Sequence, residues 1–148
     1  MTAPDCCVTM AHMMMPQHAN PQGNVHGGVV MKFIDDAAAV VAMRHSRSTV
    51  VTAAVEQLSF HHPVFIGNLL SLKASLNMTG RTSMEIGVRV EAENPLNGKI
   101  VHIASAYLTF VAIDENHQPK SINPWLPDTP ESKRRELDAR ARKKRKNS

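Results

Sequence analysis

The segment from Gly27 to about Arg44 is the feature that most limits how this chain can fold. Its residues are apolar on every face of a helix, and Lys, Asp or Arg interrupts the pattern only at positions 32, 35, 36 and 44. A helix that is apolar all round is expected to be buried. Because this is the one apolar helix that the sequence predicts, we expect a sheet to wrap around it.

Four strands are predicted after this helix. They cover Val50–Phe60, Leu69–Met78, Met84–Glu91 and Lys99–Ile113, and the third alternates apolar and polar residues with a clear period of two. The sequence therefore predicts an α+β fold, in which an antiparallel β-sheet surrounds one long central α-helix. The last strand is nearly apolar on both faces, which predicts a central position or contact with a second copy of the chain.

The two ends of the chain differ from this central domain. Residues 1–19 show little periodicity, and they are expected to begin with disorder and to end in an optional short strand. Residues 1–9 are predicted to be disordered, residues 10–125 to form the folded domain, and residues 126–148 to form a basic helix and tail. Asp128 and Glu131, with Pro130 between them, mark the start of that helix. Only Leu137 is strongly apolar beyond this point, so we expect a solvated helix supported by three i,i+4 ion pairs, Glu131–Arg135, Glu136–Arg140 and Asp138–Arg142.

The net charge of +4 is unevenly distributed. Residues 133–146 hold nine Lys or Arg and two acidic residues, so this tail carries +7 and the rest of the chain −3. A nucleic-acid-binding protein usually carries basic charge interleaved with aromatic residues on a folded face, and the tail has no aromatic residue. We therefore expect no nucleic-acid partner. A binder of anionic surfaces through the tail remains an alternative, which a salt titration would test.

The apolar runs, the N-terminal residues and the cysteines together predict the location of the protein. No apolar run approaches the roughly 20 residues of a membrane helix, and residues at the N-terminus do not resemble a signal peptide. Cys6 and Cys7 are adjacent and are interpreted as free thiols in a reducing compartment. The predicted location is cytoplasmic, with no insertion into a membrane.

The chemistry of the chain is concentrated where the helix begins. The stretch Asn20–Gly28 leads into the helix, and its glycine pair allows a ligand to approach N–H groups that have no intrahelical partner. Asp35 follows about two turns later. Donors for an oxyanion, followed by a carboxylate base, suggest hydrolysis of a carbonyl compound.

Each of these residues also has a simpler interpretation. Asn24 can be a turn residue, His26 can order the loop, and Gly27–Gly28 can form a tight turn into the helix. Asp35 and Asp36 could both be solvated, although their side chains point about 100° apart, which places at least one near buried surface. It is the combination of Asn24, the glycine pair and Asp35 in one short segment that favours a functional site.

Other catalytic patterns are missing from the sequence. It has no G-x-S-x-G, no phosphate-binding G-x-x-x-x-G-K-[ST] and no G-x-G-x-x-G. Adjacent His61 and His62 would point to opposite faces of a strand and would not chelate a metal together. We therefore expect no metal site.

Several motifs resemble those of the hotdog-fold acyl-CoA thioesterases, of the YciA type and the brain type. They run from Ala19 to Gly28, continue as Met31-Lys32-x-Ile34-Asp35, and recur in Phe60-x-x-Pro63-x-x-x-Gly67, Gly80-Arg81-Thr82-Ser83-Met84-Glu85 and Thr109-Phe110-Val111-Ala112-x-Asp114. The resemblance covers roughly residues 10–125. It implies a hotdog fold and hydrolysis of acyl-CoA to a free acid and CoA, without a metal or a separate cofactor.

The resemblance also implies roles for individual residues. Asp35 would be the general base or nucleophile, and Asn24, from the other subunit, would position the water or the thioester. The N–H of Gly28 would polarise the thioester carbonyl, with Phe60 and the segment His26–Gly28 binding substrate. Arg81, Thr82 and Ser83 would hold part of the CoA moiety. The implied assembly is a homo-oligomer with a dimer as the minimal unit, and a trimer of dimers as the full hexamer.

Two alternatives remain open at this stage. A hotdog dehydratase acting on hydroxyacyl thioesters would use a histidine as base, but His26 precedes the helix rather than lying in a dehydratase-like loop. A non-enzymatic protein that binds acyl-CoA or another anionic ligand is the second alternative.

Overall fold

The computed structural model describes residues 6–146 of the chain. Its elements are β1 (Cys7–Met13), η2 (Pro16–His18), α1 (Gly27–Ser46), β2 (Thr49–Phe60), β3 (Leu69–Thr79), β4 (Ser83–Glu93), β5 (Ile100–Ile113) and α2 (Pro130–Lys146). The predicted central helix and the four strands that follow it are confirmed, and their ends shift by only one or two residues.

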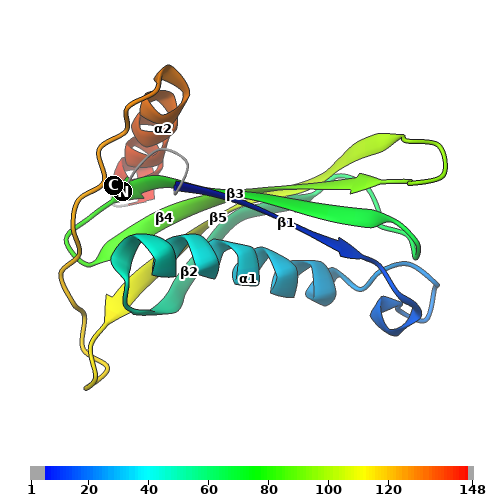
Figure 1. The fold of residues 1–148 in the computed structure, drawn as a ribbon, viewed down its shortest axis with the longest axis horizontal. Coiled ribbons are helices and arrows are strands. Elements are labelled where there is room, and N and C mark those ends of the chain that lie inside the picture. The colour runs from blue at the N-terminus through cyan, green and yellow to red at the C-terminus, as the bar shows by residue number, and fades with distance from the viewer. Residues whose placement is uncertain (1–5, 147–148) are drawn as a thin grey trace.

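The five strands form a single antiparallel sheet in the order β1-β3-β4-β5-β2. Helix α1 lies along one face of this sheet and contacts all five strands, whereas α2 lies on the opposite face and contacts β3 (Figure 1). A long helix against a curved antiparallel sheet is the predicted fold class.

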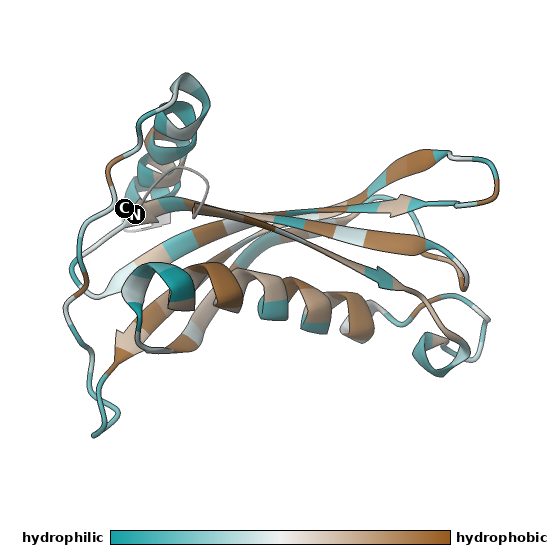
Figure 2. Ribbon diagram, viewed as in Figure 1, coloured by the Kyte–Doolittle hydropathy of each residue, from teal (hydrophilic) through white to brown (hydrophobic). Residues whose placement is uncertain are grey.

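One stripe of α1 packs against the sheet and contributes to the core of the protein. It consists of Val30, Ile34, Ala37, Ala38, Val41 and Ala42, at helical spacing, and small alanines allow close approach to the sheet. The opposite side of the helix is not covered, since Met31 and Met43 are each 42% exposed. The prediction that much of α1 is buried is confirmed for this stripe, while the opposite side remains exposed within a single chain. The hydropathy colours show the same contrast between α1 and the hydrophilic α2 (Figure 2).

The strand predicted to be apolar on both faces, β5, lies between β4 and β2. Leu108 and Phe110 point into the core, but Ser105, Tyr107 and Thr109 alternate with them on the outer face, which is only partly apolar. The free edge of the sheet next to β5 belongs to β2. Two valines on β2 remain exposed at this edge, Val51 at 44% and Val55 at 42%. Any apolar contact with a second chain is therefore expected at β2, not at β5.

The prediction of disorder in residues 1–9 is wrong for Cys7, Val8 and Thr9. These residues open β1 and pair with Ser75, Ala74 and Lys73 on β3. The apolar pattern of the sequence did not predict this part of β1. The strand forms through backbone hydrogen bonds with β3 and needs few apolar side chains at the edge of the sheet. Residues 1–5, which belong to the same prediction, lie outside the described residues. Neither Cys6, which is buried, nor Cys7, which is exposed, forms a disulfide within the described residues, and their Sγ atoms lie 3.3 Å apart.

The C-terminal helix exists as predicted, but it is not solvated on all sides. Its N-cap is Thr129 rather than Asp128, because Thr129 Oγ1 accepts a hydrogen bond from the N–H of Ser132 at 3.0 Å, and Ser132 Oγ accepts one from the N–H of Thr129. Ser132 and Ala139 are buried against the sheet, while Leu137 is 70% exposed. Helix α2 therefore packs on the sheet through small and polar residues. A search of the sequence for an apolar stripe does not detect such residues.

A buried ion pair fastens α2 to the sheet. The ion pairs Glu131–Arg135 and Glu136–Arg140 are confirmed, but Arg142 does not pair with Asp138. Instead, Arg142 donates to both carboxylate oxygens of Glu85 on β4, at 3.0 and 2.7 Å, and stacks 3.6 Å above the ring of Tyr107. Both charged side chains are less than a tenth exposed. Glu85 holds the pKa of Arg142 above its ordinary value, against the effect of burial.

Within residues 6–146, no helix is long and apolar enough to cross a membrane.

Candidate active site

Asp35 lies in a cavity of about 440 Å³ between α1 and the edge strand β2. Apolar side chains form most of the cavity wall, and the polar groups are few. The lining residues are Gly28, Met31, Lys32, Ile34, Asp35, Thr52, Val55, Leu58 and Leu108. A mostly apolar cavity with a small number of converging polar groups is typical of a ligand site.

The carboxylate of Asp35 is held by a neighbouring strand. Thr52 Oγ1 on β2 donates a hydrogen bond of 2.7 Å to Asp35 Oδ1. One carboxylate oxygen is thereby held, and within the described residues Oδ2 has no hydrogen-bond partner, so it is available as a hydrogen-bond or proton acceptor. Asp36 is different, since its Oδ2 forms a 2.9 Å ion pair with Lys32 on the helix surface. The structure therefore distinguishes the two adjacent carboxylates, and Asp35 is the one in the cavity.

The N-terminus of α1 is free to bind an oxyanion. Val29 and Val30 both donate their N–H to the carbonyl of His26, and the N–H groups of Gly27 and Gly28 precede these first helical bonds. His26 provides no side-chain cap. A Cβ built on either glycine would meet no protein atom within 4 Å, so the space beside both Cα atoms is open.

The loop before the helix is organised by Asn20. Its Oδ1 accepts hydrogen bonds from the N–H groups of Gln22 at 3.0 Å and Asn24 at 3.1 Å. This geometry fixes the amide plane of Asn20 and leaves its Nδ2 as the remaining donor of that side chain. Asn24 acts through its backbone, because its carbonyl accepts the N–H of Asn20 at 2.7 Å. The sequence did not single out Asn20, although Asn before Pro in a turn is a known pattern.

Gly28 and Asp35 line the same cavity, but their backbone positions are well separated along the helix. They are seven residues apart on one face of α1, which corresponds to about 10 Å along the helix axis. An oxyanion donor needs to lie about 3 Å from the carbonyl oxygen, and a base or nucleophile needs a similar distance to the same centre. This separation favours an arrangement in which Gly28 of one chain and Asp35 of another act on the same carbonyl.

A second cavity lies beside the start of α1. It measures about 320 Å³ and brings Gly27 together with Phe60 at the end of β2. His61, His62 and Pro63 also line it. The sequence prediction that Phe60 and Gly27 belong to one binding region is thus consistent with their positions, whereas His26 is exposed and lines neither of these cavities.

The turn with Arg81, Thr82 and Ser83 lies apart from both cavities within one chain. It joins β3 to β4 at the end of the sheet near the C-terminus of α1, opposite the end where α1 begins (Figure 1). Lys143 of α2 extends to this turn, with its Nζ 3.8 Å from the point where a Cβ on Gly80 would lie. Any role of this turn near Asp35 would therefore involve a neighbouring chain.

Comparison with known proteins identifies the family. The model of the thioesterase superfamily matches residues 22–99, a range that contains the start of α1, Asp35 and Thr52. The chain belongs to the thioesterase superfamily. Its hotdog fold agrees with that of solved acyl-CoA thioesterases. A hexameric acyl-CoA thioesterase in its apo form matches with a TM-score of 0.92 and 36% identity, over 97% of this chain and 92% of that chain.

Relatives of this thioesterase domain differ in length. Protein VdlD of Helicobacter pylori is 34% identical over 142 residues, which is 96% of this chain and 81% of that protein. Acyl-coenzyme A thioesterase 11 of Mus musculus is 38% identical over 139 residues, but the chain spans only 23% of its length. The chain likewise spans 36% of the cytosolic acyl coenzyme A thioester hydrolase of Mus musculus, with 32% identity.

An acyl-CoA hydrolase from Staphylococcus aureus provides a further comparison. Its complex with butyryl coenzyme A, coenzyme A and coenzyme A disulfide matches with a TM-score of 0.88 and 30% identity, over 97% of this chain and 88% of that chain. Structures of three alanine variants of the same hydrolase also match. They replace an asparagine at its position 28, an aspartate at its position 43 and a threonine at its position 60.

Proposed function

We propose that this protein hydrolyses acyl-CoA thioesters to a free acid and CoA. The observation that carries the proposal is the cavity in which Asp35, oriented by Thr52, faces an apolar wall. The apolar residues suit an acyl chain, and the carboxylate suits activation of water or direct attack on the thioester. The superfamily match and the names of the relatives agree with this reaction.

The spacing of residues supports three members of the site. In the S. aureus hydrolase the substituted asparagine lies 15 residues before the aspartate, and the threonine lies 17 residues after it. In this chain the same spacings relate Asn20 and Thr52 to Asp35. We therefore assign the positioning asparagine to Asn20 in place of Asn24, which the sequence had favoured. The backbone hydrogen bonds of Asn20 give it the fixed orientation that this role requires.

In the proposed mechanism, the carbonyl oxygen of the thioester accepts hydrogen bonds from the N–H groups at the start of α1, near Gly28. Asp35 either removes a proton from the attacking water, after which the tetrahedral intermediate breaks its C–S bond and the CoA thiolate takes up a proton, or it attacks the carbonyl carbon itself. In the second case the C–S bond breaks to release CoA, and water then hydrolyses the resulting anhydride to the free acid and restores the carboxylate. Thr52 keeps one oxygen of the carboxylate in place while the other reacts. Negative charge on the carbonyl oxygen develops at the positive end of the α1 dipole, where it is stabilised.

The proposed active unit is a dimer formed through the free edge of β2. Antiparallel pairing of two β2 strands near their midpoints brings the Phe60 end of one chain to the Thr52 end of the other. Phe60 accompanies Gly27 at the helix start, and Thr52 accompanies Asp35. In this pairing the oxyanion donors of one chain would lie near the carboxylate of its partner. The two groups could then act on the same carbonyl. A trimer of dimers remains a prediction, in keeping with the hexameric relatives.

The turn at Arg81, Thr82 and Ser83 is proposed to bind phosphates of a CoA molecule whose thioester occupies the site of a neighbouring chain. Arg81 is exposed, and Lys143 of α2 adds a second cation at the same turn. A cytoplasmic location also remains a prediction.

The test is steady-state release of free thiol from acyl-CoA substrates of increasing chain length, with the Asp35→Asn variant as control. Turnover that depends on Asp35 would support the proposal. Failure to release thiol from any acyl-CoA would contradict it and would favour a binding protein.

A further inference from the structure

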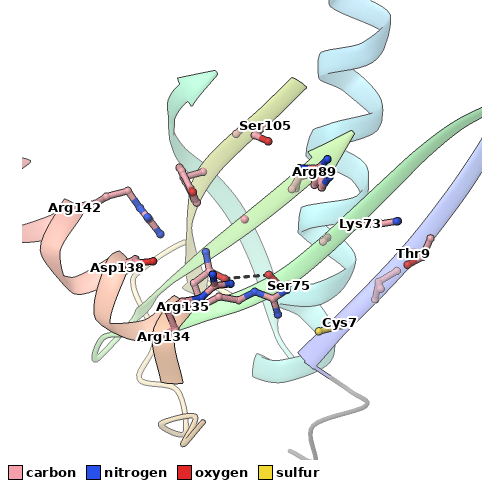
Figure 3. A pocket seen from close by; sticks show the side chains of 17 residues that line it. Cys7, Thr9, Lys73, Ser75, Arg89, Ser105, Arg134, Arg135, Asp138 and Arg142 are labelled. Atoms are coloured by element: carbon pink, nitrogen blue, oxygen red, sulfur yellow. Dashed lines mark hydrogen bonds between the residues drawn. The ribbon is translucent and has the colours of Figure 1, made fainter. Parts of the chain in front are cut away.

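A third cavity lies on the face of the sheet opposite to Asp35. It measures about 400 Å³, is open to solvent on one side, and lies between α2 and the outer faces of β1, β3, β4 and β5. Figure 3 shows Asp138 and Arg142 extending from α2 toward the sheet, with Lys73 and Arg89 on neighbouring strands. The thioesterase site described above does not use this cavity.

Cationic and hydroxyl groups dominate its lining. The cations are Lys73, Arg89, Arg134, Arg135 and Arg142, the hydroxyl groups are those of Thr9, Ser75, Ser105 and Tyr107, and the lining carboxylate is Asp138. Small residues of the central strands, Gly87 among them, form the floor. A Cβ on Gly87 would lie 2.8 Å from Asn77 Nδ2, so glycine at this position leaves room for the polar groups beside it.

Ion pairs neutralise only part of this charge. Glu85 pairs with Arg142 and Glu131 with Arg135, while Lys73 and Arg89 share the single carboxylate of Glu91. The hydrogen bond from Lys73 lowers the pKa of Glu91, and the one from Arg89 acts in the same direction. Among the described residues, Arg134 makes no ion pair. The cavity and its partner carboxylates therefore retain an excess of positive charge.

The cavity is held open by rigid contacts. Arg142 is locked by two hydrogen bonds to Glu85 and by Tyr107, and Asn77 donates to Glu85 at 3.2 Å. Ser75 in turn donates to Asn77 at 3.1 Å. Because these side chains are already ordered, binding would require little additional ordering of the protein.

Asp138 gives the cavity a second chemical feature. It extends toward the sheet without the Arg142 pair that its sequence spacing predicts, and it remains available as a hydrogen-bond acceptor (Figure 3). A carboxylate beside arginines would repel a simple anion, but it can accept hydrogen bonds from the hydroxyl groups of a sugar. The lining thus suits a ligand that carries both phosphate and sugar hydroxyl groups.

We propose that the cavity between α2 and the sheet binds a nucleoside phosphate, with the phosphates near Arg134, Lys73 and Arg89 and the ribose near Asp138. The nucleotide could be free, or it could be the nucleotide part of a CoA molecule. Both share this chemistry, and the experiment distinguishes them.

The experiment is calorimetric titration of the full-length protein at fixed ionic strength with adenosine diphosphate, pyrophosphate and inorganic phosphate. We expect saturable binding of adenosine diphosphate and at least tenfold weaker binding of inorganic phosphate. Arg134→Ala should raise the dissociation constant for adenosine diphosphate about tenfold, as expected for loss of one hydrogen bond to a charged group. Lys73→Gln, on the opposite wall, should weaken binding as well.

Matched controls separate a site from general charge attraction. Lys133→Ala removes the same charge from the neighbouring residue, which does not line the cavity, and should change the dissociation constant less than about twofold. Asp138→Asn should weaken binding of adenosine diphosphate and leave pyrophosphate unchanged or tighter. Thermal unfolding of each variant verifies that it is folded.

Absence of saturable binding would overturn the proposal, and so would equal losses in Lys133→Ala and Arg134→Ala. Asp35→Asn should bind adenosine diphosphate normally, so the outcome is independent of whether the protein is a thioesterase. Competition by CoA that depends on Arg134 would identify the substrate as the source of the nucleotide. Undiminished binding in the presence of saturating CoA would identify a free nucleotide, and both results would support the site.

Discussion

Thr52 donates a hydrogen bond of 2.7 Å to Asp35, and this contact joins the edge strand β2 to the central helix α1. The bond connects the proposed catalytic carboxylate to the strand through which we expect two chains to associate. Changes at the dimer interface should therefore reach the carboxylate directly. Four predictions follow from this arrangement and from the docking of α2.

Replacing Asp35 by Asn should abolish most activity without unfolding the protein. The amide keeps the shape and the Thr52 contact but cannot accept a proton or attack, so kcat should fall roughly 10²–10⁴-fold. Asp36→Asn is the matched control, because Asp36 is ion-paired with Lys32 at the surface, and kcat should change only slightly. Thiol release measured for both variants checks this. Equal losses would mean that the two carboxylates act together.

Replacing Thr52 by Val tests the orientation of the carboxylate. Valine has nearly the same shape but no hydroxyl group, and kcat should fall roughly 10- to 150-fold with little change in KM, since a hydrogen bond to a charged group contributes about 1.5–3 kcal/mol. Thr52→Ser should retain most activity. If the serine variant is as slow as the valine variant, the methyl group matters and the hydroxyl does not.

Mixing two inactive variants tests whether two chains share one site. Asn20→Ala and Asp35→Ala should each be inactive alone, and joint dissociation and reassociation should restore part of the activity. In a mixed dimer with shared sites, one site carries both changes and the other carries neither. Asn24→Ala in place of Asn20→Ala is the comparison, and it should retain activity by itself. Proven subunit exchange without recovery would place both residues in one chain's site.

Arg142→Met should destabilise the protein through the buried partner that it leaves behind. Glu85 is only 8% exposed, and breaking a buried ion pair on one side costs about 3–5 kcal/mol of unfolding free energy. Arg140→Met is the control, since Arg140 pairs with Glu136 at 52% exposure, and it should cost about 0–1 kcal/mol. Urea unfolding measures both. Similar losses in the two variants would show that α2 contributes through its overall charge.

The central part of the fold could be predicted because local patterns were strong there. The apolar helix and the alternating strand Ser83–Glu93 specify their own structure through side-chain periodicity. The edge strand β1 was harder, because an edge strand shows weak periodicity, and it forms through backbone pairing with β3. The docking of α2 was not predictable either, because Ser132, Ala139 and Arg142 show no apolar stripe.

The same distinction applies to the candidate site, where residues close in sequence were predictable and a contact between distant elements was not. The sequence identified Asp35 and the glycine pair because they lie on one helix, within a segment whose spacing is local. Thr52 was missed because its contact with Asp35 depends on how β2 passes the helix, which no periodicity encodes.

By itself, the sequence determined the local elements, their order and the chemical groups at the start of α1. The tertiary structure decided which groups meet: Thr52 with Asp35, Arg142 with Glu85, and α2 with the outer face of the sheet. The physical reason is that helix and strand periodicity act over a few residues, whereas these contacts depend on packing between elements far apart in the chain.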